Sequence, residues 1–210
     1  MTSVRPELES LPPPFSSAGA VNGSFHCRLT VLGNAIMMSG PQRKSRSEKE
    51  EATVAAQGDL ELLNDPIAQE LLSSTIPARL AYTWSDGTPR AVPIWFHWTG
   101  EEIVMGSPHD APKVPALQAN PAVAITIDSE SWPAKVLLIR GPAQVELVDG
   151  MVAEYGSAAR RYFGEEQGRA WTEQVSQMLP RMARIAVRPE WVGILDFQTR
   201  FPAALAKRMS

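Results

Sequence analysis

One loop of the chain carries a glycine, a serine and a lysine that could together bind an anion. The loop reads GSPHDAPK over residues 106–113, with Gly106 and Ser107 at its start and Lys113 at its end. Glycine lets a ligand approach the main chain, a serine hydroxyl donates a hydrogen bond, and a lysine ammonium supplies a full positive charge. Asp110 stands where a helix N-cap would, and a helix start attracts anions. The loop predicts a phosphate site, although it also suits an ordinary solvated helix start.

Short strands joined by tight turns lead into this loop. Hydrophobic residues alternate along 79–84 and again along 91–98, which is typical of half-buried strands. Asp86-Gly87 between them favours a two-residue hairpin turn with positive φ angles. Pro93 cannot donate to a ladder and predicts the edge of a sheet or a bulge. With a third strand over 103–107, these strands form a meander, from which small antiparallel barrels are closed.

The later part of the chain supplies the remaining elements of one domain. Strands are expected at 123–127, 136–148 and within 181–197, and Gly141-Pro142 predicts a bend or bulge in the second of them. Helices are expected after Asp65 as N-cap, from Asp149 to Gly164, and around 171–178. Apolar residues at helical spacing in the last two helices, Tyr155 and Trp171 among them, indicate core positions.

Four pieces of sequence occur in a distinctive order between Asp65 and Asp196. They read ARLAYTWSDGTPRAVPIWFHW, MGSPHDAPKV, LQANPAVAITI and AKVLLIRGPAQVELV. Together they resemble the FMN-binding split barrels related to pyridoxamine 5'-phosphate oxidase. The resemblance implies an α+β, mainly β fold: a six- to seven-stranded antiparallel split β-barrel with flanking helices.

The resemblance also implies a cofactor site for FMN, built from three stretches of the chain. Its residues are Pro93, Ile94, Trp95, Gly106, Ser107, Lys113 and Lys135. The first stretch would run beneath the isoalloxazine ring, with main-chain groups at the polar edge of the ring. The loop residues would reach the ribityl chain and the phosphate, where Lys113 pairs with the phosphate. Lys135 would lie near the pyrimidine end of the ring.

Two departures from the family pattern bear on the reaction. Relatives that oxidise pyridoxamine phosphate carry an arginine directly before the lysine, and this chain has Pro112 there. They also carry an Arg-and-His motif near the C-terminus, whereas LDFQTRFPAALAKRMS has no histidine. We therefore expect an FMN-dependent oxidoreductase that acts on a different small molecule. The residues indicate neither that substrate nor a catalytic acid or base.

Other functions remain open at this stage. A reductase of the same fold could use 8-hydroxy-5-deazaflavin, whose longer phosphate-bearing tail would need a basic groove; arginines that could supply it are Arg160, Arg161, Arg184 and Arg188. A protein of another class, a non-enzymatic flavin or haem binder or a dimeric interaction module, is the further alternative. Histidines at 26, 97 and 109 show no metal-ligand spacing, so no metal site is predicted.

The composition of the chain limits the kinds of partner that it can bind. The chain has 210 residues, 44% of them hydrophobic, and a net charge of −3. This charge argues against a nucleic-acid partner, and no apolar run approaches the length of a membrane span. The single cysteine, Cys27, fits a reducing cytoplasm. A flat flavin ring must be covered on both faces, which together with the resemblance predicts a homodimer.

The first 58 residues differ in composition from the rest. They include LPPPFSSAGA and the charged run QRKSRSEKEE without sustained periodicity, so we expect a disordered extension over 1–58 and the flavin-binding split barrel over 59–210. Met37 and Met38 leave open a later start of translation.

Overall fold

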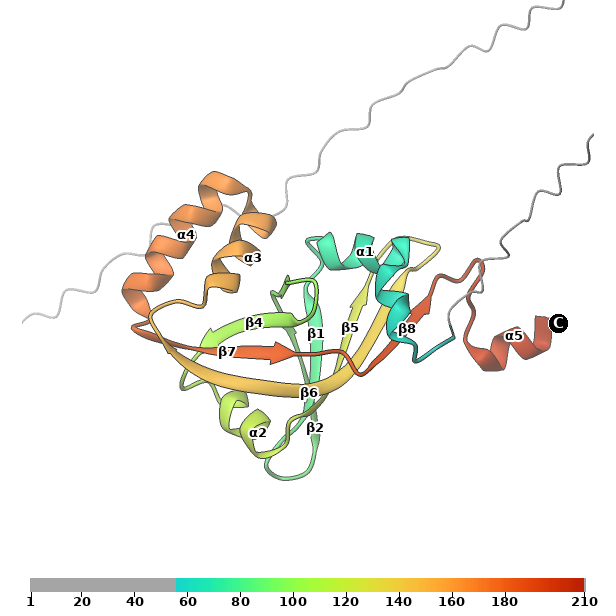
Figure 1. The fold of residues 1–210 in the computed structure, drawn as a ribbon, viewed down its shortest axis with the longest axis horizontal. Helices are drawn as coiled ribbons and strands as arrows, with labels where there is room; N and C mark the ends of the chain where they lie inside the picture. The colour runs from blue at the N-terminus through green and yellow to red at the C-terminus, as the bar shows by residue number, and fades with distance from the viewer. Residues whose placement is uncertain (1–55, 210) are drawn as a thin grey trace, which may run out of the picture. The chain divides into compact units, whose positions relative to one another are not determined.

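The computed structural model describes residues 56–209, so the extension predicted for 1–58 lies almost wholly outside the described residues. The helices are η1 (Leu60–Asn64), α1 (Pro66–Ser73), α2 (Lys113–Ala119), α3 (Ala153–Phe163), α4 (Glu165–Met178) and α5 (Ala203–Met209). The strands are β1 (Ala78–Thr83), β2 (Pro89–Ile94), β3 (His97–Trp98), β4 (Ile103–Pro108), β5 (Ala122–Asp128), β6 (Val136–Asp149), β7 (Arg181–Val187) and β8 (Trp191–Leu195). Figure 1 shows their arrangement.

The strands form an 8-stranded sheet whose path begins and ends with strands that are neighbours in the sequence. The order is β2-β1-β5-β6-β7-β4-β3, with β8 paired to β6. In a flat sheet, β2 and β3 would lie about 29 Å apart, at roughly 4.8 Å per strand. Only Trp95 and Phe96 join these two strands, and such a link spans at most about 11 Å. The sheet must therefore curl until its edges meet, which confirms the predicted split barrel.

Two corrections concern the strands and turn before the loop. The alternation over 91–98 does not form one strand: β2 pairs with β1, β3 pairs with β4, and Phe96 between them is fully buried. The hairpin between β1 and β2 is also longer than predicted, because the Trp84 N–H donates to the Thr88 carbonyl at 2.8 Å. Of its residues only Gly87 has a positive φ, of 82°. The expected position of Pro93 on an edge strand is confirmed.

The long strand β6 connects the two halves of the barrel. It pairs with β5 and β8 through its first half and with β7 through its second. The strand is not interrupted at Gly141-Pro142; instead residues 188–190, between β7 and β8, oppose these two residues as a bulge. A Cβ on Gly141 would lie 2.2 Å from the carbonyl oxygen of Arg188. Glycine is therefore required by the close approach of two main chains.

Three helix starts can be compared with the sequence. Asp65 caps α1 as predicted, accepting from the N–H of Ile67 at 2.9 Å. Asp110 does not cap α2, which starts at Lys113 after Pro112 without a side-chain cap. Asp149 does not start α3, because it still pairs with Arg181 in the ladder between β6 and β7 and its carboxylate accepts from that arginine at 3.0 Å.

Two separate apolar clusters hold the domain together. The larger fills the barrel interior, with Leu80, Ile125 and Leu137 fully or almost fully buried. The smaller joins β4, β7 and α4 through Val104, Met182, Ala186, Val152 and Val175. The helices α3 and α4, which lie side by side at one end of β4 and β7 in Figure 1, thus cover the outer face of these strands. The outer face of β4 and β7 is therefore apolar, and α3 and α4 shield it from solvent.

The described N-terminal residues add to the edge of β8. The side-chain amide of Gln57 donates to the Ile194 carbonyl at 2.6 Å and accepts from the Ile194 N–H at 3.0 Å. The Gly58 N–H donates to the Val192 carbonyl at 2.7 Å. The side-chain amide of Gln57 therefore pairs the main-chain N–H and carbonyl of Ile194 at the edge of β8, as a neighbouring strand would.

Gly141→Ala should lower the free energy of unfolding by about 2 kcal/mol, because the added methyl group meets a main-chain carbonyl that cannot rotate away. The matched control is Gly156→Ala in α3, where an added Cβ has only ordinary contacts, at 3.6 and 3.7 Å. This change should leave stability equal or raise it by up to about 1 kcal/mol. Urea unfolding of both variants measures the difference; equal midpoints would contradict the close approach.

Candidate functional site

Residues of β2, of β4 with the loop that follows it, and of the α3–α4 region enclose a cavity of about 350 Å³. Such a volume lies within the range of about 300–1,000 Å³ typical of small-molecule sites. The lining residues are Val92, Pro93, Ile94, Gly106, Ser107, Pro108, Lys113, Tyr155, Trp171, Val175, Met178, Leu179 and Met182. The cavity is thus mainly apolar, with a serine and a lysine among its few polar groups.

The cavity brings together most of the residues proposed from the sequence. Pro93 and Ile94 line it from β2, and Gly106, Ser107 and Lys113 from β4 and the start of α2. They lie together because the curled sheet carries its edge strand β2 round towards β4. The roles assigned to these residues on a cofactor remain predictions.

Two proposed residues lie elsewhere. Trp95 is not in the cavity lining, whereas Tyr155 and Trp171 are. The ring centroid of Trp95 lies 6.1 Å from that of Tyr155 and 6.3 Å from that of Trp171. Lys135 points to α1, where its ammonium donates to both carboxylate oxygens of Glu70 at 2.7 and 2.5 Å. A contact of Lys135 with a bound ring would require that ion pair to open.

Ser107 carries a buried hydroxyl without a partner among the described residues. It lies in β4 opposite Ala183 of β7, and only 2% of the residue is exposed. Leaving a buried polar group unpaired costs about 1–3 kcal/mol. Since the residue lines the cavity, a ligand there could accept or donate the missing hydrogen bond.

Lys113 supplies the positive charge of the cavity. None of the ion pairs formed by residues 56–209 includes it, so no carboxylate of that region lies within 4.0 Å of its ammonium. Burial lowers the pKa of Lys113, because the charged form loses water. An anion in the cavity would restore the interactions that the ammonium lacks.

Gly106 has a packing role besides its predicted role in the approach of a ligand. A Cβ at this position would lie 2.8 Å from Cδ2 and 2.9 Å from Cβ of Tyr155. The space that a side chain at position 106 would fill is therefore occupied by Tyr155 of α3, which lies close to the main chain of β4. Glycine at 106 lets α3 pack directly against the strand, and the tyrosine ring becomes part of the cavity.

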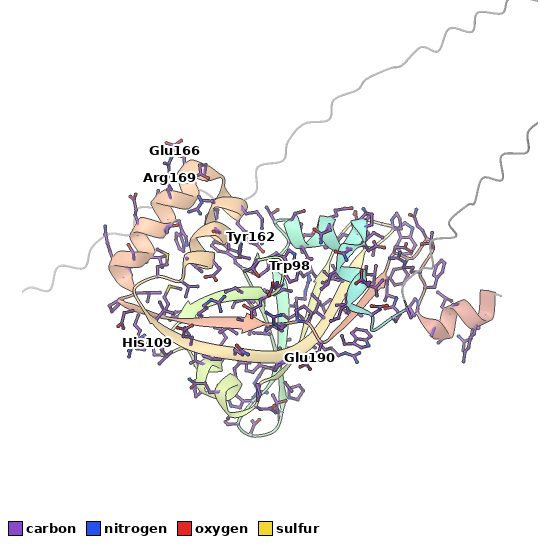
Figure 2. The ribbon with its side chains drawn as sticks, in the orientation of Figure 1. Trp98, His109, Tyr162, Glu166, Arg169 and Glu190 are labelled. Carbon is purple, nitrogen blue, oxygen red and sulfur yellow. The ribbon has the colours of Figure 1, made fainter. Side chains whose placement is uncertain are left out.

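Charged and aromatic contacts fix α3 against the barrel. Arg184 of β7 donates to Glu154 at 2.8 and 3.0 Å, and hydrogen bonds from Arg184 hold the pKa of Glu154 below its ordinary value although burial alone would raise it. Arg161 donates to the carbonyl of Phe96 and lies over its ring. Tyr162, between α3 and the barrel in Figure 2, donates its hydroxyl to the Ile76 carbonyl at 3.1 Å.

Tyr155 and Trp171 are the two aromatic residues of the cavity lining, and the sequence indicated them as core positions and not as site residues. Their helical spacing correctly placed them on the apolar sides of α3 and α4, but the spacing alone does not reveal that this side borders a cavity. His109, at the end of β4 in Figure 2, lies with Nδ1 3.2 Å from the Arg181 carbonyl. Across residues 56–209, no group of three His, Cys, Asp or Glu is arranged to hold a metal ion.

The comparisons with known proteins agree with the resemblance noted in the sequence. The family model of pyridoxamine 5'-phosphate oxidase matches residues 65–196. The chain belongs to this family. No helix of the described part is long and apolar enough to cross a membrane.

Several solved structures are similar to this chain, and the first of the following, with a TM-score above 0.5, shares its fold. A conserved hypothetical protein from Mycobacterium tuberculosis is 15% identical, with a TM-score of 0.52, over 69% of this chain and 89% of its own. An F420 reductase is 27% identical, with a TM-score of 0.47, over 60% of this chain and 94% of its own. A putative pyridoxamine 5'-phosphate oxidase from Listeria innocua is 24% identical, with a TM-score of 0.46, over 64% and 98%. Among curated protein sequences, none matches the chain.

Ser107→Ala should raise the free energy of unfolding of the ligand-free protein by about 1 kcal/mol, because it removes a buried hydroxyl that has no partner. The matched control is Ser129→Ala, whose hydroxyl accepts from the Lys135 N–H at 2.9 Å and whose loss should destabilise the protein. Thermal and urea unfolding measure both. Equal destabilisation by the two changes would mean that Ser107 has a structural partner.

Proposed function

We propose that the protein is an oxidoreductase that holds FMN in the cavity and acts on a small molecule. One observation carries the proposal: the unpartnered, buried hydroxyl of Ser107 and the half-buried ammonium of Lys113 line the same cavity. A phosphate monoester offers strong acceptors and negative charge to both groups at once. When bound, FMN supplies hydride transfer, and the chain supplies binding and orientation.

The β2 edge suits the polar edge of a flavin ring. Proline in a sheet is tolerated where its nitrogen faces away from the neighbouring strand, and β2 has no neighbour on its outer side. In an antiparallel strand the carbonyl of a residue points to the same side as its nitrogen. We therefore expect the Pro93 carbonyl to face outward at the cavity, where it can accept from the imide N–H of the ring.

The arginines favour FMN over a deazaflavin with a longer anionic tail. Arg184 pairs with Glu154 and Glu102, Arg188 pairs with Glu101 at 2.7 Å, and Arg160 lies 3.8 Å from Glu165. Arg161 donates to the main-chain carbonyls of Leu72 in α1 and of Phe96 between β2 and β3. None of these four arginines is in the cavity lining. The residues that were expected to form a basic groove for the longer tail therefore do not border the cavity.

A haem-binding function has less support from the cavity. The lining residues within the described range include neither histidine nor cysteine, which are the commonest protein ligands of haem iron.

The proposed function also includes a homodimer. Sedimentation of the flavin-loaded protein measures its mass and so tests this part of the proposal.

Lys113→Met should raise the Kd for FMN by about 30-fold, because a charge-assisted hydrogen bond at a half-buried site contributes about 2 kcal/mol. The affinity for riboflavin, which has no phosphate, should change little. Lys207→Met, outside the cavity in α5, is the control of equal charge. Isothermal titration of both flavins against the three proteins gives the answer; an unchanged Kd for FMN in Lys113→Met would refute the phosphate site.

FMN affinity should also fall as the pH rises from neutral into the alkaline range. Burial lowers the pKa of Lys113 in the free protein, and a bound phosphate raises it again. Binding is therefore strongest at pH values below the pKa of the free protein and is lost above it. In Lys113→Met this dependence should disappear, which titrations at several pH values detect. An identical dependence in both proteins would assign it to another group.

A further inference from the structure

Beside the cavity lies a cluster of aromatic rings from distant parts of the chain. Its members are Trp95, Tyr155, Tyr162, Phe163 and Trp171. Trp95 is central: its ring centroid lies 5.0 Å from that of Tyr162, nearly parallel, and 4.8 Å from that of Phe163, nearly perpendicular. Such distances are those of well-packed aromatic pairs. The cluster joins the β2–β3 link to α3 and α4.

Two members of the cluster, Tyr155 and Trp171, also line the cavity. The indole Nε1 of Trp171 donates to the Tyr155 hydroxyl at 3.0 Å, so each ring restrains the other. Tyr155 rests on the main chain of Gly106, and both rings contact Trp95. These contacts hold the two rings in place from three sides. The cavity therefore has a preformed aromatic wall next to Ser107 and Lys113.

We propose that Tyr155 and Trp171 form the wall against which the isoalloxazine ring of FMN lies, so that α3 and α4 of the same chain cover one face of the ring. This inference rests on the proposed function and adds the position of the ring. A flat aromatic ring gains most from a rigid aromatic partner, because neither side loses rotamer freedom on contact. Trp95, which is outside the lining, acts as a positioning residue that supports the wall.

The wall predicts an optical signature as well as an affinity. When a flavin lies in contact with an indole or phenol ring, that ring passes one electron to the light-excited flavin and receives it back. The exchange leaves no chemical change, but it quenches the emission of the flavin. Bound FMN should therefore be much less fluorescent than free FMN.

The experiment compares FMN and riboflavin on the full-length protein and its variants. Trp171→Leu should weaken both flavins by the same factor, about tenfold, because the contact is with the ring that they share. Lys113→Met should weaken FMN alone. The control is Trp132→Leu, since Trp132 is 78% exposed and outside the lining of the cavity. Binding is measured calorimetrically and emission by fluorescence lifetime.

A second variant guards against loss of folding. Tyr155→Phe combined with Trp171→Phe keeps two rings in the wall but removes both good electron donors. It should bind FMN within about threefold of the unmodified protein, while the lifetime of bound FMN lengthens severalfold.

Failure of the two proposals can be told apart. If the unmodified protein binds neither flavin, the proposed function is wrong. If it binds FMN in a Lys113-dependent manner, but the Trp171 and Tyr155 variants change neither affinity nor lifetime, the ring lies elsewhere and the aromatic wall is refuted.

Discussion

The two-residue link between β2 and β3 is the constraint on which the other features depend. Because Trp95 and Phe96 join strands at opposite ends of the sheet path, the sheet has to close on itself. Closure turns one face inward to form the main core and leaves the other face, on β4 and β7, outside the barrel. That outer face carries Val104, Met182 and Ala186, which must be covered. The α3–α4 hairpin, inserted between β6 and β7, provides the cover.

The cavity follows from the same constraint. At the link the two side chains point to different surroundings: Phe96 is buried in the barrel core, and Trp95 packs among the aromatic residues of α3 and α4. Tyr155 can reach β4 only because residue 106 is glycine. The edge strand β2, the strand β4 and the helices thus meet around one space. The mainly apolar lining of that space is a consequence of covering an outer face, whereas Ser107 and Lys113 are not needed for that purpose.

Several features that depend on local chemistry were predicted correctly, although the helix cap at Asp110 and the two-residue turn at Asp86-Gly87 were wrong, and features that depend on partners far along the chain were missed. Asp65 as an N-cap, Gly164 as a helix end and Pro93 on an edge strand were foreseen, since a few neighbouring residues decide each. The break at Trp95 was not, because the alternation of residue types continues through it. Likewise, the ion pair of Lys135 with Glu70 joins residues 65 positions apart. Among the cavity residues, Ser107 and Lys113 stood out because their residue types suit an anion, and the resemblance to a family then assigned them to a cofactor.

The cavity differs in its electrostatics from the surface around it. Arg184, Arg188 and Arg200 each meet carboxylates, so their charges are compensated within the chain. Lys113 is half-buried without such a carboxylate, and its partial burial lowers its pKa. A charge without a carboxylate partner and an unpaired hydroxyl in one cavity make the empty protein less stable than it could be. In the proposed function, the phosphate of the ligand would offset this cost, so that the stability missing from the free protein would return as binding affinity.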